Sequence, residues 1–164
     1  MCTSNIGAQS GLVSRWSNDD FDSLSWHDNH IHSFAVREGE HGEGELILDI
    51  DFILEWLCDP ATRRCDFRLA PATLTFHRVS DLVLALDYAT PTAALVPASM
   101  NGITREPHVY PNGYRSYRWR IDINWPTGSI SFLGHGFTQV LRSSPVLLSQ
   151  QCLAPAERES LLRA

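Results

Sequence analysis

Residues 45–58 alternate between apolar and charged side chains, and this alternation constrains the fold more than any other feature. All even positions are apolar, whereas the acidic residues Glu45, Asp49, Asp51 and Glu55 fall at odd positions. A period of two is typical of a strand with one face buried and the other in water. Wound as a helix, the same apolar residues would spread around all sides. We therefore predict a strand over 45–58.

Residues 117–125 repeat the pattern, with Arg118 and Arg120 on the polar side. Parity assigns Trp119 and Trp125 to the apolar side, as it assigns Trp56 to the apolar side of the first strand. We interpret these three tryptophans as core residues rather than as a stacking surface for sugars or bases.

Turn residues divide the rest of the chain into further short strands and one helix. Pro126 and Gly128 predict a hairpin turn. Residues 154–164 are expected to form a short helix, with Pro155 near its first position. The other strands are expected at 30–37, 66–77, 82–88, 129–133 and 138–141, with short ones at 93–96 and 103–106.

The predicted fold is mainly β, with seven to eight antiparallel strands and a short C-terminal helix. The strands would form a curved sheet, a sandwich or a partly closed barrel. Residues 1–24 are expected to be a loosely ordered segment with one helical turn near residues 18–23, and residues 25–164 a single domain.

Composition excludes some classes of function. The chain has 164 residues and a net charge of −6, which argues against binding to the phosphates of nucleic acids. No apolar run approaches the ~18 residues of a membrane span, and the N-terminus lacks the pattern of a secretory signal. All 13 basic residues are arginine, which we attribute to codon usage in a GC-rich bacterial genome. A cytoplasmic location is predicted.

The four cysteines, at positions 2, 58, 65 and 152, have no Cys-x-x-Cys spacing, so zinc-finger and thioredoxin interpretations fail. Cys58 and Cys65 flank a turn, where they could face each other across a hairpin. Without an export signal, reduced thiols are expected.

The polar side of the sheet offers one candidate binding surface. It comprises Asp49, Asp51, Glu55, His77, Arg118 and Arg120. A solvated face keeps carboxyl pKa values near normal, so pairing of the acids with Arg118 or Arg120 is favoured over acid–base catalysis. No catalytic or nucleotide-binding motif is present.

The densest polar cluster, residues 26–32, offers a second candidate. Asp28, His30 and His32 supply a carboxylate and two imidazoles, which could hold a divalent metal ion with open positions. The alternative is a structural role at the start of a strand. The leading interpretation therefore includes no cofactor.

Three segments carry a resemblance to known proteins: Ser25–His32, Leu48–Trp56 and Tyr117–Pro126. They resemble a small family of uncharacterised bacterial proteins, which implies a mostly antiparallel β domain and supplies no catalytic residues. The opening Trp26-His27-Asp28 is also similar to the start of some immunity proteins of bacterial toxin systems.

The functional hypothesis is a binding or protein-interaction module that contacts a protein partner through its polar sheet face. A metal-dependent enzyme using Asp28, His30 and His32 is the rival class. A small-ligand carrier is the third, and it requires a closed barrel. The sequence does not indicate an oligomeric state.

Overall fold

Antiparallel strands dominate the computed structural model, which describes residues 14–89 and 95–164. The strands are β1 (Arg15–Ser17), β2 (His30–Glu38), β3 (Gly44–Asp59), β4 (Arg64–His77), β5 (Ser80–Asp87), β6 (Ala98–Val109), β7 (Arg115–Trp125), β8 (Thr127–Gly134), β9 (Gly136–Leu141) and β10 (Val146–Leu148). The helices are the 3₁₀ turns η1 (Asn18–Ser23) and η2 (Glu40–Gly42) and the α-helix α1 (Pro155–Arg163). The predicted mainly β class and C-terminal helix are confirmed.

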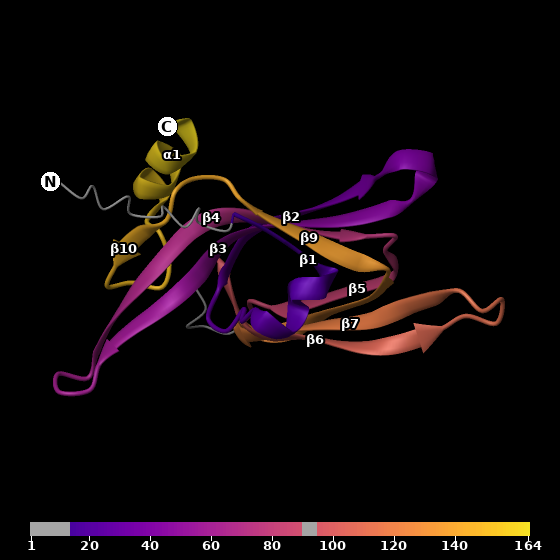
Figure 1. The fold of residues 1–164 in the computed structure, drawn as a ribbon, viewed down its shortest axis with the longest axis horizontal. Coiled ribbons are helices and arrows are strands. Elements are labelled where there is room, and N and C mark those ends of the chain that lie inside the picture. Colours follow the sequence, from indigo (N-terminus) through magenta and orange to yellow (C-terminus); the bar gives the residue numbers. More distant parts are fainter. Residues whose placement is uncertain (1–13, 90–94) are drawn as a thin grey trace, which may run out of the picture.

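All ten strands belong to one sheet, with the order β1-β9-β4-β3-β2-β6-β7-β8-β5 and with β10 added to β4. The order is an open path, so the barrel needed by a small-ligand carrier is not formed. β2 and β6 share only two residue pairs, and at this narrow junction the sheet folds over. The part containing β6 and β7 then lies beneath the part containing β2, β4 and β9 (Figure 1).

The main core lies between these two parts of the sheet. The even-numbered residues Leu46, Leu48, Ile50 and Phe52 of β3 are all buried there, as the alternation predicts. They share the core with an aromatic group of Trp26, Phe76, Trp119, Phe132 and Phe137. Burying each large apolar side chain stabilises the fold by about 1.5–3 kcal/mol. The strand therefore turns its even-numbered face toward the core.

Most predicted strands are confirmed, and the differences have physical causes. β1 and β10 contain three residues each, too few to show a period in the sequence. The expected short strand at 103–106 lies within the longer β6, where Pro107 is tolerated because β6 pairs with β2 only at residues 98 and 99 and is otherwise an edge. Of the expected strand at 93–96, residues 93 and 94 lie outside the described ranges, and Leu95 and Val96 are not in a strand.

A β-bulge in β3 limits how far the alternation can be extended. Ile53 pairs with Leu69, but Glu55 pairs with Arg68 and Trp56 with Phe67, so one extra residue enters β3. The extra residue moves Trp56 to the opposite face of the sheet. Trp56 is consequently 41% exposed, and its prediction as a core residue is wrong.

The other tryptophans divide in the same way. Trp119 is fully buried, as predicted, whereas Trp125 at the end of β7 is 44% exposed. Parity therefore predicted burial correctly in the middle of a strand and wrongly beside a bulge or a turn.

Beyond the bulge, β3 and β4 continue as a two-stranded arm of residues 55–68, which projects from the body at lower left in Figure 1. Near its tip Cys58 and Cys65 form a disulfide, so the prediction of reduced thiols is wrong for this pair. Disulfides persist mainly in oxidising compartments, so this bond weighs against the cytoplasmic location, which stays a prediction.

Residues 15–23, assigned from the sequence to the N-terminal segment, form β1 and η1, and Trp16 and Phe21 pack against the main core. The helical turn expected near 18–23 is confirmed as η1. Neither α1 nor any other helix in the described ranges has the length and apolar character to cross a membrane.

Candidate functional site

His32 and Asp51 meet across the pair of neighbouring strands β2 and β3. His30 lies opposite Asp51 and Ser33 opposite Asp49, so His32 is the extra residue of a β-bulge. Bulges redirect a side chain that a regular strand would point elsewhere. Here the His32 Nε2 atom lies 2.8 Å from Asp51 Oδ2.

Asp51 is fully buried, so its prediction as part of a solvated face is wrong. The segment that follows β10 covers this side of β3. The backbone N–H of Leu153 donates a 2.9 Å hydrogen bond to Asp51 Oδ2, and Arg158 Nε donates one of 2.9 Å to Oδ1. Burial acts to raise the pKa of Asp51, but the hydrogen bonds from His32, Leu153 and Arg158 outweigh it and hold the pKa below its usual value.

The same arginine binds Asp49. Arg158 NH1 donates to Asp49 Oδ2 at 3.0 Å, and Arg142 NH1 lies 3.2 Å from Asp49 Oδ1. Arg158 is itself buried. Burial disfavours its charge, yet hydrogen bonds to the two carboxylates leave its pKa raised. A buried cation is thus neutralised by two acids of one strand, and it fixes α1 to β3.

The predicted pairing of these acids with Arg118 or Arg120 does not occur. Both arginines lie on β7, which β2 and β6 separate from β3 in the sheet order. Arg120 pairs instead with Asp122 of its own strand at 2.7 Å, and Arg118 is exposed. The sheet folds over between the two strands, a feature that alternation along each strand does not report.

Glu55 and His77 also lie apart from the cluster. Glu55 forms a 3.0 Å ion pair with Arg68 on the arm, where both side chains are about half exposed. His77 contacts Glu45 at 3.2 Å and Thr138 at 2.9 Å. The six residues predicted as one binding face therefore occupy several separate places.

Of the residues predicted as metal ligands, the structure brings only His32 into the cluster. Asp28 lies in a turn and accepts hydrogen bonds from Asn124 and Gln151. Burial lowers the pKa of His30, and its Nδ1 atom is buried without a hydrogen-bond partner.

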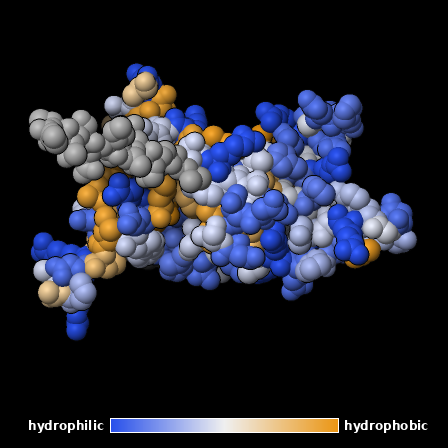
Figure 2. All heavy atoms as spheres, in the orientation of Figure 1, coloured by the Kyte–Doolittle hydropathy of each residue, from blue (hydrophilic) through white to orange (hydrophobic). Residues whose placement is uncertain are grey.

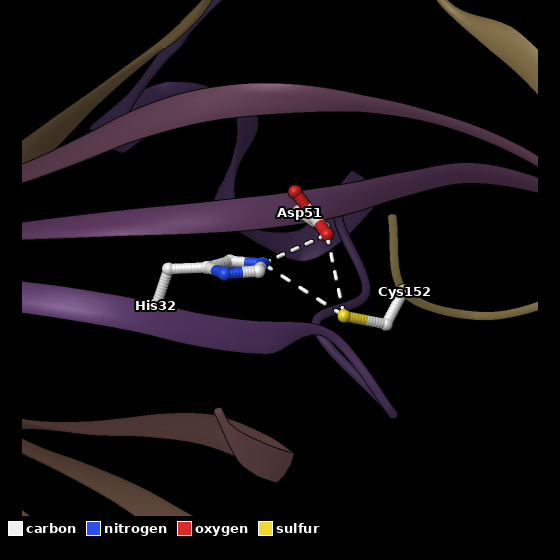
Figure 3. Close-up of side chains that lie close together, drawn as sticks. All are labelled: His32, Asp51 and Cys152. Carbon is white, nitrogen blue, oxygen red and sulfur yellow. Dashed lines mark hydrogen bonds and ion pairs between the residues drawn. The ribbon is translucent and has the colours of Figure 1, made fainter. Parts of the chain in front are cut away.

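The third member of the cluster is Cys152, in the connection between β10 and α1. Its Sγ atom lies 3.5 Å from Asp51 Oδ2 and 3.8 Å from His32 Nε2. Figure 3 shows the three side chains converging from β2, β3 and the C-terminal connection. In the described part of the chain, these are the His, Cys and acidic residues whose ligand atoms gather closely enough to hold one metal ion.

The geometry does not match a nucleophilic Cys–His–Asp relay. A relay uses both imidazole nitrogens, one toward the nucleophile and the other toward the acid. Here the thiol and the carboxylate both approach Nε2. Burial, with the nearby Asp51 charge, also raises the pKa of Cys152 to about 12, so the thiol is protonated and a weak nucleophile.

Sequence reasoning missed Cys152 and Arg158. Cys152 lies 101 residues from Asp51 in sequence, and neither its spacing nor its surroundings form a motif. Its distance from the Cys58–Cys65 hairpin is shared by Cys2, so it did not single out Cys152. Arg158 follows the helix start at Pro155 and looks like an ordinary surface cation.

Comparisons of the chain with models of protein families, with curated proteins and with solved structures found no match. The resemblance to a bacterial family and to immunity proteins therefore stays a prediction. The fold and the site together define an open, antiparallel β protein with a His–Asp–Cys cluster beneath its C-terminal segment.

Proposed function

We propose that the protein binds a thiophilic divalent metal ion of the Zn²⁺ class through His32, Asp51 and Cys152. The observation that carries this proposal is the mutual approach of the three ligand atoms, at 2.8, 3.5 and 3.8 Å. One nitrogen, one oxygen and one sulfur are a donor set that Zn²⁺ accepts.

The spacing is close to that of a tetrahedral site. Metal–ligand bonds of about 2.0–2.3 Å place neighbouring ligand atoms about 3.3–3.8 Å apart. The two distances that involve Cys152 Sγ fall at 3.5 and 3.8 Å. The 2.8 Å contact between His32 and Asp51 is a hydrogen bond. It would open by roughly half an ångström when a metal ion binds both atoms and the Nε2 proton moves to Nδ1 of the same ring.

The surroundings of the cluster also suit a metal ion. Asp51 is held in place by Leu153 N–H and Arg158, and such outer hydrogen bonds orient metal ligands. The His32 side chain is 17% exposed while Asp51 is fully buried, so an ion has access from the solvent side. Three protein ligands leave the fourth position to water or to a bound molecule.

Metal titration of the purified protein tests the proposal. We expect Zn²⁺ to bind at one site with the release of the Cys152 thiol proton. Co²⁺ should add a thiolate-to-metal absorption band. His32→Gln and Cys152→Ser should each lower the affinity by at least about 100-fold, because loss of even an outer hydrogen bond costs about 10–100-fold.

The matched control is His77→Gln, because His77 also contacts a strand carboxylate but has no thiol beside it. This variant should bind Zn²⁺ like the unaltered protein. Absence of stoichiometric binding, or binding that survives both His32→Gln and Cys152→Ser, would overturn the proposal.

A second candidate function is protein interaction, and the exposed apolar residues of the arm favour it. Trp56 and Leu57 are 41% and 39% exposed, and the Cys58–Cys65 disulfide closes the hairpin beside them. Tryptophan is enriched among the residues that dominate protein interfaces. We propose a protein partner that contacts this arm rather than the predicted polar face. The resemblance to immunity proteins implies a bacterial toxin as that partner.

Site-specific photo-crosslinking tests the arm. A crosslinker at position 57 should give a discrete adduct in an extract of the source cells, and the adduct should disappear in Trp56→Ala. A crosslinker at Val83, which is 58% exposed on β5, is the control. Identical adducts from both positions would contradict a role for the arm.

A further inference from the structure

The Cys152 ligand lies outside the sheet, in the connection between β10 and α1. Residues 149–163 consist of this connection, which follows β10, together with α1 itself. They lie over the outer face of β3 and β4, on the side opposite the main core. Apolar atoms gather where β10 and α1 meet these strands, at the left in Figure 2.

The helix is too weak to persist without this docking. α1 has nine residues, whereas isolated helices shorter than about 12–15 residues are marginal in water. Its N-cap residue is Ala154, whose side chain has no acceptor for the exposed N–H groups. The helix therefore depends on its contacts with the sheet.

Those contacts converge on the acids of β3 and on a small apolar cluster. Leu153 N–H and Arg158 bind Asp51, and Arg158 also binds Asp49. Leu153 and Leu161 pack against Ile53, Phe67 and Leu69. Asp51 is thus both a proposed metal ligand and the main polar anchor of the segment.

We propose that metal binding controls the docking of residues 149–163, with His32 and Asp51 holding the ion on the sheet and Cys152 tying the segment to it. This inference rests on the proposed metal site. Undocking removes Cys152 from the ion, so the bound metal opposes it. When the segment leaves, Ile53, Phe67 and Leu69 lose the cover of Leu153 and Leu161, and the protein gains an apolar surface that depends on the metal.

Hydrogen exchange of the full chain, with and without Zn²⁺, tests the coupling. The reporters are the amides of Leu153, which donates to Asp51, and of Arg158, which donates to the Ala154 carbonyl. At a free Zn²⁺ concentration of 100 times Kd, their exchange should slow by about 50- to 100-fold, because the undocked form lacks the Cys152 ligand and binds the ion at least about 100-fold more weakly. The amide of Tyr110, in the β6–β7 hairpin, should not change.

Two variants separate the effect of the metal on docking from that of the Arg158 contacts with Asp49 and Asp51. In Cys152→Ser, Zn²⁺ should leave the exchange of residues 149–163 unchanged. In Arg158→Met, exchange should be faster in both states, while Zn²⁺ still slows it. Loss of the Zn²⁺ effect in Arg158→Met would contradict the role given to Cys152.

Calorimetric Zn²⁺ titration of the same samples distinguishes a failure of the metal site from a failure of its coupling to the docking of residues 149–163. No Zn²⁺ binding overturns the metal site itself. Zn²⁺ binding that depends on His32 and Cys152 but leaves the Leu153 and Arg158 amides unchanged overturns only the coupling. Equal slowing throughout the chain also overturns it, because the ion would then stabilise the whole fold rather than this segment.

Discussion

Two histidine–carboxylate pairs occur in the sheet, and only one has become a candidate site. His32 and Asp51 lie 2.8 Å apart, and His77 and Glu45 lie 3.2 Å apart. Asp51 is fully buried, whereas the Glu45 side chain retains 17% exposure and His77 36%.

The partners of the two pairs explain the difference. Glu45 is paired with Arg37 and His77, which are its direct neighbours across β2 and β4. Asp51 also receives contacts from residues 152, 153 and 158, which lie 101 to 107 positions away in the chain. Contacts from neighbouring strands alone, as at Glu45, leave an ion cluster that is open to water. A distant covering segment adds burial, fixed hydrogen bonds and a thiol.

Replacing the carboxylates tests this comparison most strongly. Asp51→Asn should lower the free energy of unfolding by about 3–5 kcal/mol, because it breaks a buried ion pair. Glu45→Gln should cost less than about 1 kcal/mol, as expected for a pair near the surface. Urea unfolding of the metal-free proteins measures both. Similar small losses for the two variants would show that burial of Asp51 does not separate the pairs.

Replacing the histidines should also destabilise the protein more at His32 than at His77, with a smaller difference than for the carboxylates. His32→Ala removes a donor from a buried carboxylate, which should cost about 1–3 kcal/mol. His77→Ala leaves Glu45 paired with Arg37 and open to water, so the loss should stay below about 1 kcal/mol. The measurement is again urea unfolding without metal. A larger loss for His77→Ala would reverse the comparison.

The smallest expected effect is the pH dependence contributed by Glu45. The Arg37 hydrogen bond, together with that of His77, lowers the pKa of Glu45 from its ordinary value of 4.5. Since the folded pKa is the lower one, this stabilisation is present above pH 4.5 and disappears as the pH falls through the folded value. The stability difference between the unaltered protein and Glu45→Gln should therefore shrink on acidification, by less than about 1 kcal/mol. A difference that grows below pH 4.5 would contradict the assigned sign.

Local patterns were sufficient for much of the fold. Alternation in 45–58 predicted β3 and the buried residues Leu46, Leu48, Ile50 and Phe52, because side chains of a strand point to alternate faces. The turn residues around Pro126 predicted the β7–β8 hairpin. Pro155 predicted the start of α1. Each of these features depends on residues that are close in the sequence.

The candidate site was predicted only in part. His32 was recognised as a ligand type, but with Asp28 and His30 as its partners. The bulge at His32 and the bulge after Ile53 each shift a strand by one residue, and such a shift exchanges the two faces. A strict period of two has no means of indicating where it is interrupted.

The sequence by itself determined the β class, the strand that forms the centre of the core and the supply of imidazole, carboxylate and thiol groups. Tertiary structure alone decided that Asp51 is buried, that Arg118 and Arg120 lie far from it in the sheet, and that Cys152 reaches it. The reason is that strand periodicity reports only which face a side chain takes. What covers that face depends on where a segment about a hundred residues away comes to rest.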